Sequence, residues 1–222
     1  MQPLLNSAEA LNTSSNFYSN EKLFTNENAT RQNFFNYVSS YSVVNIFSHA
    51  KGDTSNNEPM LFMHDSSIRL SELQILNNPA TRLVLLSACQ TNVGKAATGE
   101  GIYSLARGFA TAGIPSIAAT LWKADEQTIY AISEKFNKYL AAGIPKDEAL
   151  QKAKLDFIQN NPNNNKLLPY YWANMIVIGN TDAIKLQSTK TYTYLWLIVA
   201  GFLISSTIFL ILKSKRKRSK GR

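Results

Sequence analysis

The only cysteine of the chain, Cys89, stands where a catalytic group is expected. It follows the apolar run at residues 83–86 and two small residues, and a polar, glycine-rich stretch begins directly after it. In an open α/β sheet, ligands and chemistry lie just beyond the carboxyl ends of the strands, so a cysteine there is a candidate nucleophile. A free cysteine is also among the most frequently buried residues. Considered alone, Cys89 is therefore better explained by packing, and other residues must decide.

A thiol that acts as a nucleophile needs activation, since its ordinary pKa of about 8.5 leaves it mostly protonated at neutral pH. An imidazole can accept the thiol proton, or can later protonate the leaving amine. The chain has two histidines, His49 and His64. His49 comes at the end of a predicted strand at residues 43–47, whereas His64 falls in a predicted hairpin and is expected at the surface. Considered alone, His49 is better explained as a structural histidine.

Strands and helices alternate along the chain. Strands are predicted at residues 43–47, 82–89, 115–121 and 173–178, and helices near residues 7–11, 31–40, 71–78, 102–112, 125–142 and 145–160. This alternation predicts an α/β fold, in which a mostly parallel central sheet is flanked by helices. Four main strands are few for such a sheet, so we expect a further amino-terminal strand to be missing from this chain.

Shorter signals predict how these elements are connected. A loop is predicted at residues 50–57, and a hairpin at residues 60–70. Ser71 is expected to cap the helix that follows, and Pro79 to end it. Gly113 and Gly143 are expected to end the helices at residues 102–112 and 125–142, and Pro145 is expected in the first turn of the helix that follows.

The basic charge of the chain is concentrated at its carboxyl end. The formal net charge is +8, but residues 213–222 hold seven of the 23 Lys and Arg residues and no acidic residue. The rest of the chain is nearly balanced, so nucleic-acid binding by the main domain is not supported. One cysteine and two histidines are too few for a closed zinc site of these ligands. We expect neither a metal nor a cofactor.

A membrane-spanning helix is predicted at residues 192–212. These 21 residues carry no charge, and a span of about 20 apolar residues crosses the hydrocarbon core of a bilayer. Tyr192, Tyr194 and Trp196 stand at its start, as in the aromatic belt of an interface, and the basic tail at residues 213–222 follows at once. The predicted organisation is a main domain at residues 1–182, a linker at 183–191, the span and the tail.

The sequence leaves open on which side of the membrane the main domain lies. The positive-inside rule places the tail at residues 213–222 in the cytoplasm, and one span then places residues 1–191 on the other side. Yet the first 16 residues have no basic segment and no continuous apolar core, so they are not a signal peptide. Either the chain is part of a longer protein with a signal, or it inserts by its tail and keeps its domain inside.

Five segments, in this order, resemble the CHAT domain, a caspase-like peptidase domain of the clan that includes separase, gingipain and clostripain. They are Ser-His-Ala-Lys-Gly at residues 48–52, Leu-Ser-Ala-Cys-Gln-Thr at 86–91, the glycine-bounded stretch at 99–113, Leu-Trp with an aspartate at 121–125, and Pro-Tyr-Tyr-Trp-Ala to Gly at 169–179. Each segment alone is weak, but the set is specific. The resemblance covers residues 5–182.

This resemblance implies that His49 and Cys89 form a catalytic dyad on either side of the substrate peptide. The oxyanion of the reaction is then expected to accept hydrogen bonds from the backbone N–H groups of Cys89 and of the residue after the histidine. That residue is often glycine in the family and is Ala50 here. An alanine still donates its N–H, but a positive φ at this position would strain it by about 1 kcal/mol or more.

Trp122 and Asp125, which follow the predicted strand at residues 115–121, are candidates for the substrate pocket. Trp122 is expected to pack along the cleft rather than to bind one group specifically. Asp125 either favours a basic substrate side chain or caps the helix that begins after it, and we favour capping. Three aromatic residues near the end of the domain are expected in the core or the cleft wall: Tyr170, Tyr171 and Trp172.

The function predicted from these residues is that of a membrane-anchored cysteine endopeptidase that cleaves protein or peptide substrates. A regulatory domain or partner is expected to control it. The alternative is a catalytically silent caspase-like module for signalling or interaction. A nucleotide-binding function is poorly supported, because no glycine-rich fingerprint follows the first strand.

Overall fold

A four-stranded sheet forms the centre of the molecule. In the computed structural model, which describes residues 4–51, 58–76, 79–87, 100–122, 125–161 and 165–186, its strand order is β1-β5-β6-β7. The strands are β1 (Val43–Phe47), β5 (Leu83–Ser87), β6 (Ser116–Thr120) and β7 (Met175–Gly179). The first three are parallel and β7 is antiparallel to β6, which confirms the predicted α/β fold with a mostly parallel sheet.

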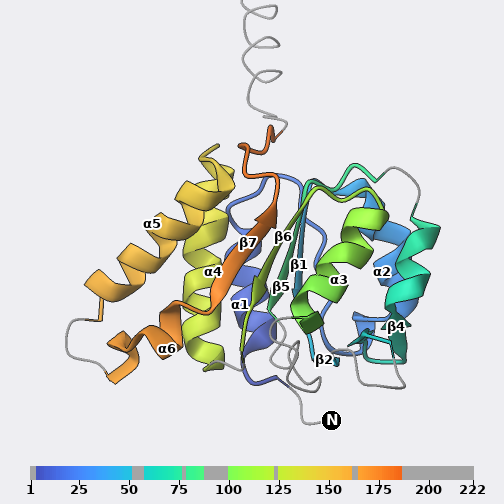
Figure 1. Cartoon of the computed structure of the whole chain (residues 1–222), viewed down its shortest axis with the longest axis horizontal. Helices are drawn as coiled ribbons and strands as arrows, with labels where there is room; N and C mark the ends of the chain where they lie inside the picture. The colour runs from blue at the N-terminus through green and yellow to red at the C-terminus, as the bar shows by residue number, and fades with distance from the viewer. Residues whose placement is uncertain are drawn as a thin grey trace, which may run out of the picture. The chain divides into compact units, whose positions relative to one another are not determined.

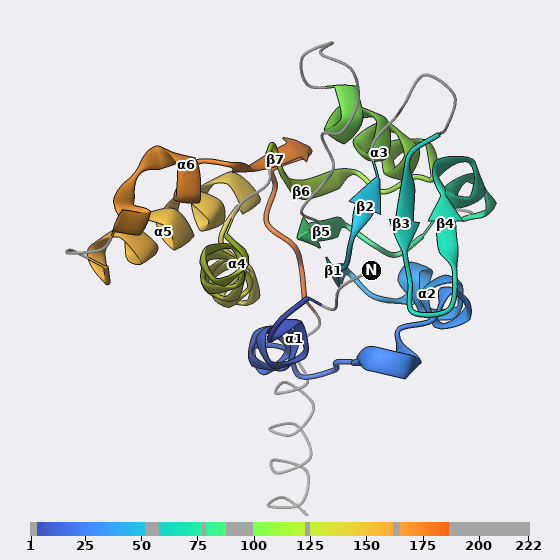
Figure 2. The same ribbon diagram turned by 90° about the horizontal axis from the view of Figure 1, so that it is seen from below.

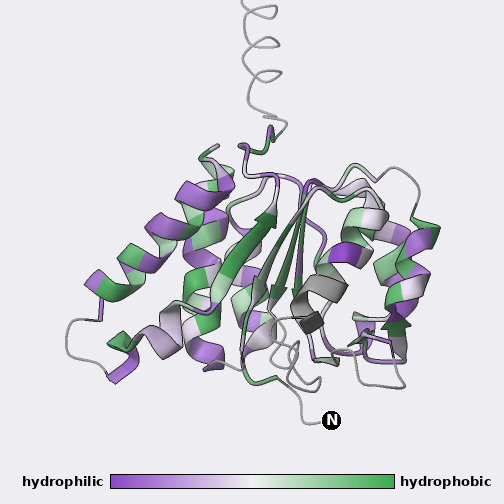
Figure 3. Cartoon of the chain, in the orientation of Figure 1, coloured by the Kyte–Doolittle hydropathy of each residue, from purple (hydrophilic) through white to green (hydrophobic). Residues whose placement is uncertain are grey.

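The two central strands, β5 and β6, are buried along their whole length (Figure 1). Alternate side chains of a strand point to opposite faces of the sheet. Leu83 and Leu85 accordingly pack into one core cluster, whereas Val84 and Leu86 pack into another on the opposite face. A strand covered on both faces needs an apolar run, which residues 83–86 of β5 and 117–119 of β6 supply. Figure 3 colours the strands of this sheet mainly as hydrophobic.

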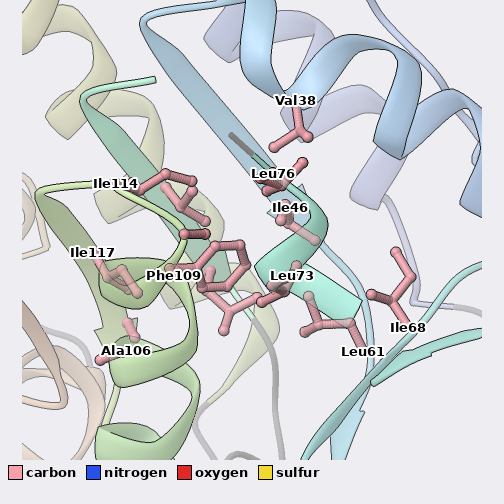
Figure 4. Packing of buried hydrophobic residues seen from close by; sticks show 14 of the residues in the cluster. Val38, Ile46, Leu61, Ile68, Leu73, Leu76, Ala106, Phe109, Ile114 and Ile117 are labelled. Atoms are coloured by element: carbon pink, nitrogen blue, oxygen red, sulfur yellow. The ribbon is translucent and has the colours of Figure 1, made fainter. Parts of the chain in front are cut away.

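Helices cover both faces of the sheet. The first face carries α4 (Glu126–Ala141) and α5 (Lys146–Gln159), with α1 (Ser7–Ser15) packed against α4. The second face carries α3 (Glu100–Thr111) and the 3-10 helix η3 (Leu70–Ile75), and Figure 4 shows Phe109 of α3 beside Leu73 of η3 in this core. The remaining short helices are η1 (Asn26–Asn28), α2 (Arg31–Tyr37), η2 (Val38–Ser40), η4 (Asn165–Leu167) and α6 (Pro169–Trp172).

A second, smaller sheet stands beside the carboxyl end of β1. It consists of β2 (Ala50–Lys51), β3 (Met60–Phe62) and β4 (Ser67–Arg69), all antiparallel. The predicted hairpin is therefore confirmed, and His64 is exposed in its turn. The predicted loop from residue 50 is wrong for its first two residues, because Ala50 is buried in the core and its strand pairs with β3.

The predicted α-helix after Ser71 is the 3-10 helix η3, which begins one residue earlier. Ser71 does not cap it. Its N–H and hydroxyl groups both donate to the Glu58 carboxylate, at 2.8 Å. The Glu72 carboxylate instead accepts a hydrogen bond from the Arg69 N–H at 2.7 Å and pairs with Arg31. The Arg69–Glu72 bond thus takes the place of the predicted cap at Ser71, and Glu58 and Arg31 bind the first turn from other segments.

The ends of the later helices agree closely with the sequence. α3 and α4 end shortly before Gly113 and Gly143, as predicted, and Pro145 is the N-cap of α5 rather than part of its first turn. Within the described residues, no helix is long and apolar enough to cross a membrane. The span predicted at residues 192–212 lies outside these residues.

Candidate active site

The three parallel strands end on one row of the sheet. Phe47, the last residue of β1, stands opposite Ser87, the last residue of β5. β5 and β6 are paired at Leu86 and Ala119, so the last residues of β5 and β6 are also neighbours. His49 and Trp122 each follow two residues after this row, and Cys89 follows two residues after Ser87 along the chain. Cys89 itself lies outside the described residues.

Two elements flank this edge of the sheet. Figures 1 and 2 show α6 beside the β6–β7 side and the small β2–β4 sheet beside the β1 side, with the carboxyl ends of β1, β5 and β6 between them. His49 lies on the β2–β4 side and Trp122 on the α6 side. The structure thus brings the described candidate residues to one edge of the sheet, as the sequence predicts.

The backbone of His49 is held by β3. Its carbonyl group accepts a hydrogen bond from the Phe62 N–H at 3.0 Å, and the hydroxyl of Ser48 donates to the Phe62 carbonyl. The His49 side chain is half-buried. The β2–β3 pairing therefore fixes the backbone that carries the imidazole at the end of β1.

Ala50 adopts an unstrained backbone conformation. Among the described residues, only Asn6 and Asn26 have a positive φ without being glycine, so the strain considered for an alanine at this position does not arise. Ala50 stands opposite Leu61, and the bond from Phe62 to His49 makes this a non-hydrogen-bonded pair. The N–H of Ala50 consequently points away from β3, a direction that suits a donor to a bound group.

One face of α4 contacts the last residues of both β1 and β5. The ring of Tyr130 stacks on Phe47, with centroids 5.0 Å apart and planes 17° from parallel. One helical turn further, the hydroxyl oxygen of Ser133 lies 3.3 Å from that of Ser87. Both strands that lead to the candidate dyad are therefore held by the same helix.

The buried side-chain amide of Asn137 adds a further contact between α4 and β1. Asn137 is fully buried in α4, and it exchanges two side-chain hydrogen bonds with Asn45 of β1, at 3.1 and 3.2 Å. The Tyr18 hydroxyl donates to the same Asn137 side chain at 2.8 Å, and burial raises the pKa of Tyr18 far above its usual value. The sequence does not predict this network, since its local signal is a single asparagine on the apolar face of a helix.

Trp122 packs against α6. Its ring N–H donates to the carbonyl of Tyr170 at 2.8 Å, and the two rings stack with centroids 6.2 Å apart and planes 27° from parallel. Tyr170 in turn meets Tyr171 edge-on, with ring centroids 5.5 Å apart. These contacts show that Trp122 packs on α6.

Asp125 is the N-cap of α4. Its carboxylate accepts hydrogen bonds from the Thr128 N–H at 2.9 Å and from the Thr128 hydroxyl at 2.8 Å, which confirms capping. The same oxygen lies 2.8 Å from the Lys166 ammonium group. Partial burial acts to raise the pKa of Asp125, but the hydrogen bonds from Lys166 and Thr128 outweigh it and hold the pKa below its usual value. The charge of this carboxylate is thus already balanced inside the protein.

The described residues contain no group of three or more His, Cys, Asp or Glu side chains that could hold a metal ion. The candidate groups that the structure describes at this edge of the sheet are an imidazole, backbone N–H groups and aromatic rings, and the sequence places a thiol two residues after β5. These groups suit acyl transfer.

Comparison with known proteins identifies the family. The curated proteins contain no match to this chain. The family model of the CHAT domain matches residues 2–180, which is nearly all of the described part of the chain. This match confirms the resemblance seen in the five sequence segments, and the CHAT domain is associated with caspase-like cysteine peptidases. With the match covering this α/β domain from its first helix to its last strand, the chain belongs to the CHAT domain family.

Proposed function

We propose that the protein is a caspase-like cysteine endopeptidase, in which Cys89 is the nucleophile and His49 transfers the proton. The pairing of β1 with β5 carries this proposal. The two strands are parallel and end in register, at Phe47 and Ser87. Neighbouring strands lie about 4.8 Å apart. Two residues that follow such paired ends by the same number of positions are suited to act on one substrate bond.

The reaction follows from these groups. His49 accepts the thiol proton of Cys89, and the resulting thiolate attacks the carbonyl carbon of the scissile peptide bond. The carbonyl oxygen becomes an oxyanion that accepts hydrogen bonds from the N–H groups of Ala50 and Cys89. His49 donates a proton to the leaving amine as the C–N bond breaks. Water then attacks the thioester, which releases the carboxylic acid and restores the thiol.

We also propose that residues 192–212 anchor this peptidase in a membrane. The support is the uncharged 21-residue run, the aromatic residues at its start and the basic run at residues 213–222. The positive-inside rule favours a cytoplasmic tail. Protease accessibility of the domain in intact cells, compared with lysed cells, tests on which side residues 1–191 lie.

Cleavage of a peptide library tests the peptidase activity. The full chain is incubated with proteome-derived peptides, and new amino termini are identified by mass spectrometry for the wild type, Cys89→Ala, His49→Ala and His64→Ala. Exposed His64 is the matched control. We expect cleavage by the wild type and by His64→Ala, and a loss of about 100-fold or more in both dyad variants. Cleavage that survives Cys89→Ala excludes the proposed nucleophile, and a folded but inactive wild type favours the silent signalling module.

A further inference from the structure

An aromatic surface with one exposed and two half-buried residues lies beside the proposed site. It consists of Trp122, Tyr170 and Tyr171, and we call it the aromatic platform. Trp122 follows two residues after the end of β6, the strand next to the proposed nucleophile strand. Tyr170 is 56% exposed although it stacks on Trp122. Leu168, the N-cap of the helix α6 that contains Tyr170, is 62% exposed. Large apolar side chains are thus presented to solvent at the edge where a substrate would bind.

The platform is held rigidly. The Trp122 ring N–H donates to the Tyr170 carbonyl, and the Trp172 ring N–H donates to the Leu167 carbonyl at 2.9 Å. The Leu121 N–H donates to the carbonyl of Asn174 at 2.8 Å, so the backbone on both sides of the platform is joined. The Trp122 ring, held by its hydrogen bond and by its stack on Tyr170, loses little conformational entropy when a ligand covers it.

The charges next to the platform compensate one another. Asp125 follows Trp122 by three residues, and Lys166 precedes Tyr170 by four. Their side chains form an ion pair at 2.8 Å, and Lys166 also donates to Gln127 at 3.1 Å. A basic substrate side chain would have to compete with Lys166 for the carboxylate, and an acidic one would have to compete with Asp125. An uncharged side chain has no such competitor.

We infer that the aromatic platform binds a large apolar side chain of the peptide substrate, one or two residues from the scissile bond. This inference rests on the proposed peptidase function, which it deepens by naming the substrate class. The proposed position near the scissile bond is based on Trp122, which follows the end of β6, the strand paired with β5, since adjacent strands lie about 4.8 Å apart and an extended peptide advances about 3.4 Å per residue. The side chain is aromatic or long and aliphatic, and it lies against the rings of Trp122 and Tyr170.

Peptide binding to the full-length Cys89→Ala variant in lipid nanodiscs tests this inference without requiring catalysis. The probes are fluorescein-labelled octapeptides of alanine that carry Phe, Leu, Ser, Arg or Asp at one position in turn, and fluorescence anisotropy gives their affinities. At one position, we expect the Phe and Leu peptides to bind about tenfold more tightly than the others. Adding Tyr170→Ala is expected to remove this preference, whereas Tyr170→Phe keeps it. Ile75→Ala, which alters an exposed apolar residue of η3, is the matched control and keeps it too.

The ratio between the affinities of the apolar peptides and those of the other peptides decides the test. Equal binding of all peptides, no binding, a preference for Arg or Asp, or an apolar preference that survives Tyr170→Ala each overturns the inference. The proposed peptidase function fails separately: in that case the apolar preference is present and depends on Tyr170, but the wild type cleaves none of the preferred peptides.

Discussion

The carboxylate of Asp125 accepts hydrogen bonds from two groups of Thr128 and from Lys166. An acidic residue just beyond a strand end is an attractive candidate for binding a substrate. Here the same residue begins α4 and joins that helix to the segment before α6. At the scale of the residue, its contacts favour a role in stability, which mutation can separate from a role in specificity.

We expect Asp125→Ala to lower the free energy of unfolding by about 1 kcal/mol, because the first turn of α4 loses its cap. Asp125→Asn is the matched control, since asparagine also caps helices and only the charge opposite Lys166 is lost. Asp125→Asn is expected to lower the free energy of unfolding by less than Asp125→Ala does, because a partly exposed ion pair contributes at most about 1 kcal/mol. Urea-induced unfolding followed by tryptophan fluorescence measures both. Equal and negligible effects of the two substitutions would contradict the capping role.

The contribution of Asp125 to the free energy of unfolding is expected to decrease as the pH falls. The pKa of Asp125 in the folded protein lies below its ordinary value, so ionisation favours the folded state. Its contribution is present above the unfolded pKa of about 3.9 and is lost as the pH falls through the folded pKa. The stability difference between wild type and Asp125→Asn is therefore expected at pH 7 and is expected to disappear near pH 2. A difference that grows on acidification would contradict this assignment.

At the scale of elements, α4 contacts the two strands, β1 and β5, that lead to the candidate site residues. It stacks Tyr130 on Phe47 at the end of β1, places Ser133 against Ser87 at the end of β5, and bonds Asn137 to Asn45. The small β2–β4 sheet fixes the backbone of His49 from the other direction. The positions of the strand ends are thus set by contacts between segments far apart in the sequence.

The antiparallel edge of the sheet depends on one glycine. Gly179 of β7 has a φ of +101°, and a Cβ there would lie 2.2 Å from the Pro115 carbonyl oxygen. Gly143 is the matched control, because its φ is +78° but a Cβ added there would have no heavy atom within 4 Å. We expect Gly143→Ala to cost about 1 kcal/mol and Gly179→Ala about 3 kcal/mol. Urea unfolding measures both, and equal losses would show that the contact with Pro115 is relieved easily.

At the scale of the whole molecule, the sequence predicts the main sheet well. β1 has the predicted bounds, and β5, β6 and β7 lie within or next to the predicted ranges. β5 and β6 are recognisable because burial on both faces demands apolar runs. The places of His49 and Trp122 after strand ends follow directly from these runs, since the carboxyl ends of parallel strands meet at one edge.

The parts that the sequence did not predict depend on distant contacts. β2 has only two residues, and its pairing with β3 decides its conformation. The 3-10 helix η3 follows from bonds to Glu58 and Arg31, and α6 is a single turn between two other elements. The buried bond between Asn45 and Asn137 joins positions 92 residues apart. Local patterns carry no information on such pairings.

The proposed peptidase function rests on the joint action of Cys89 and His49, and covalent labelling of the thiol tests this joint action most directly. A peptidyl acyloxymethyl ketone reacts with an activated thiol, and the chain offers only one cysteine, so intact mass measures the rate at Cys89 alone. We expect the wild type and His64→Ala to gain one label at the same rate, and His49→Ala to react at least about tenfold more slowly. Equal labelling rates in wild type and His49→Ala would contradict the dyad.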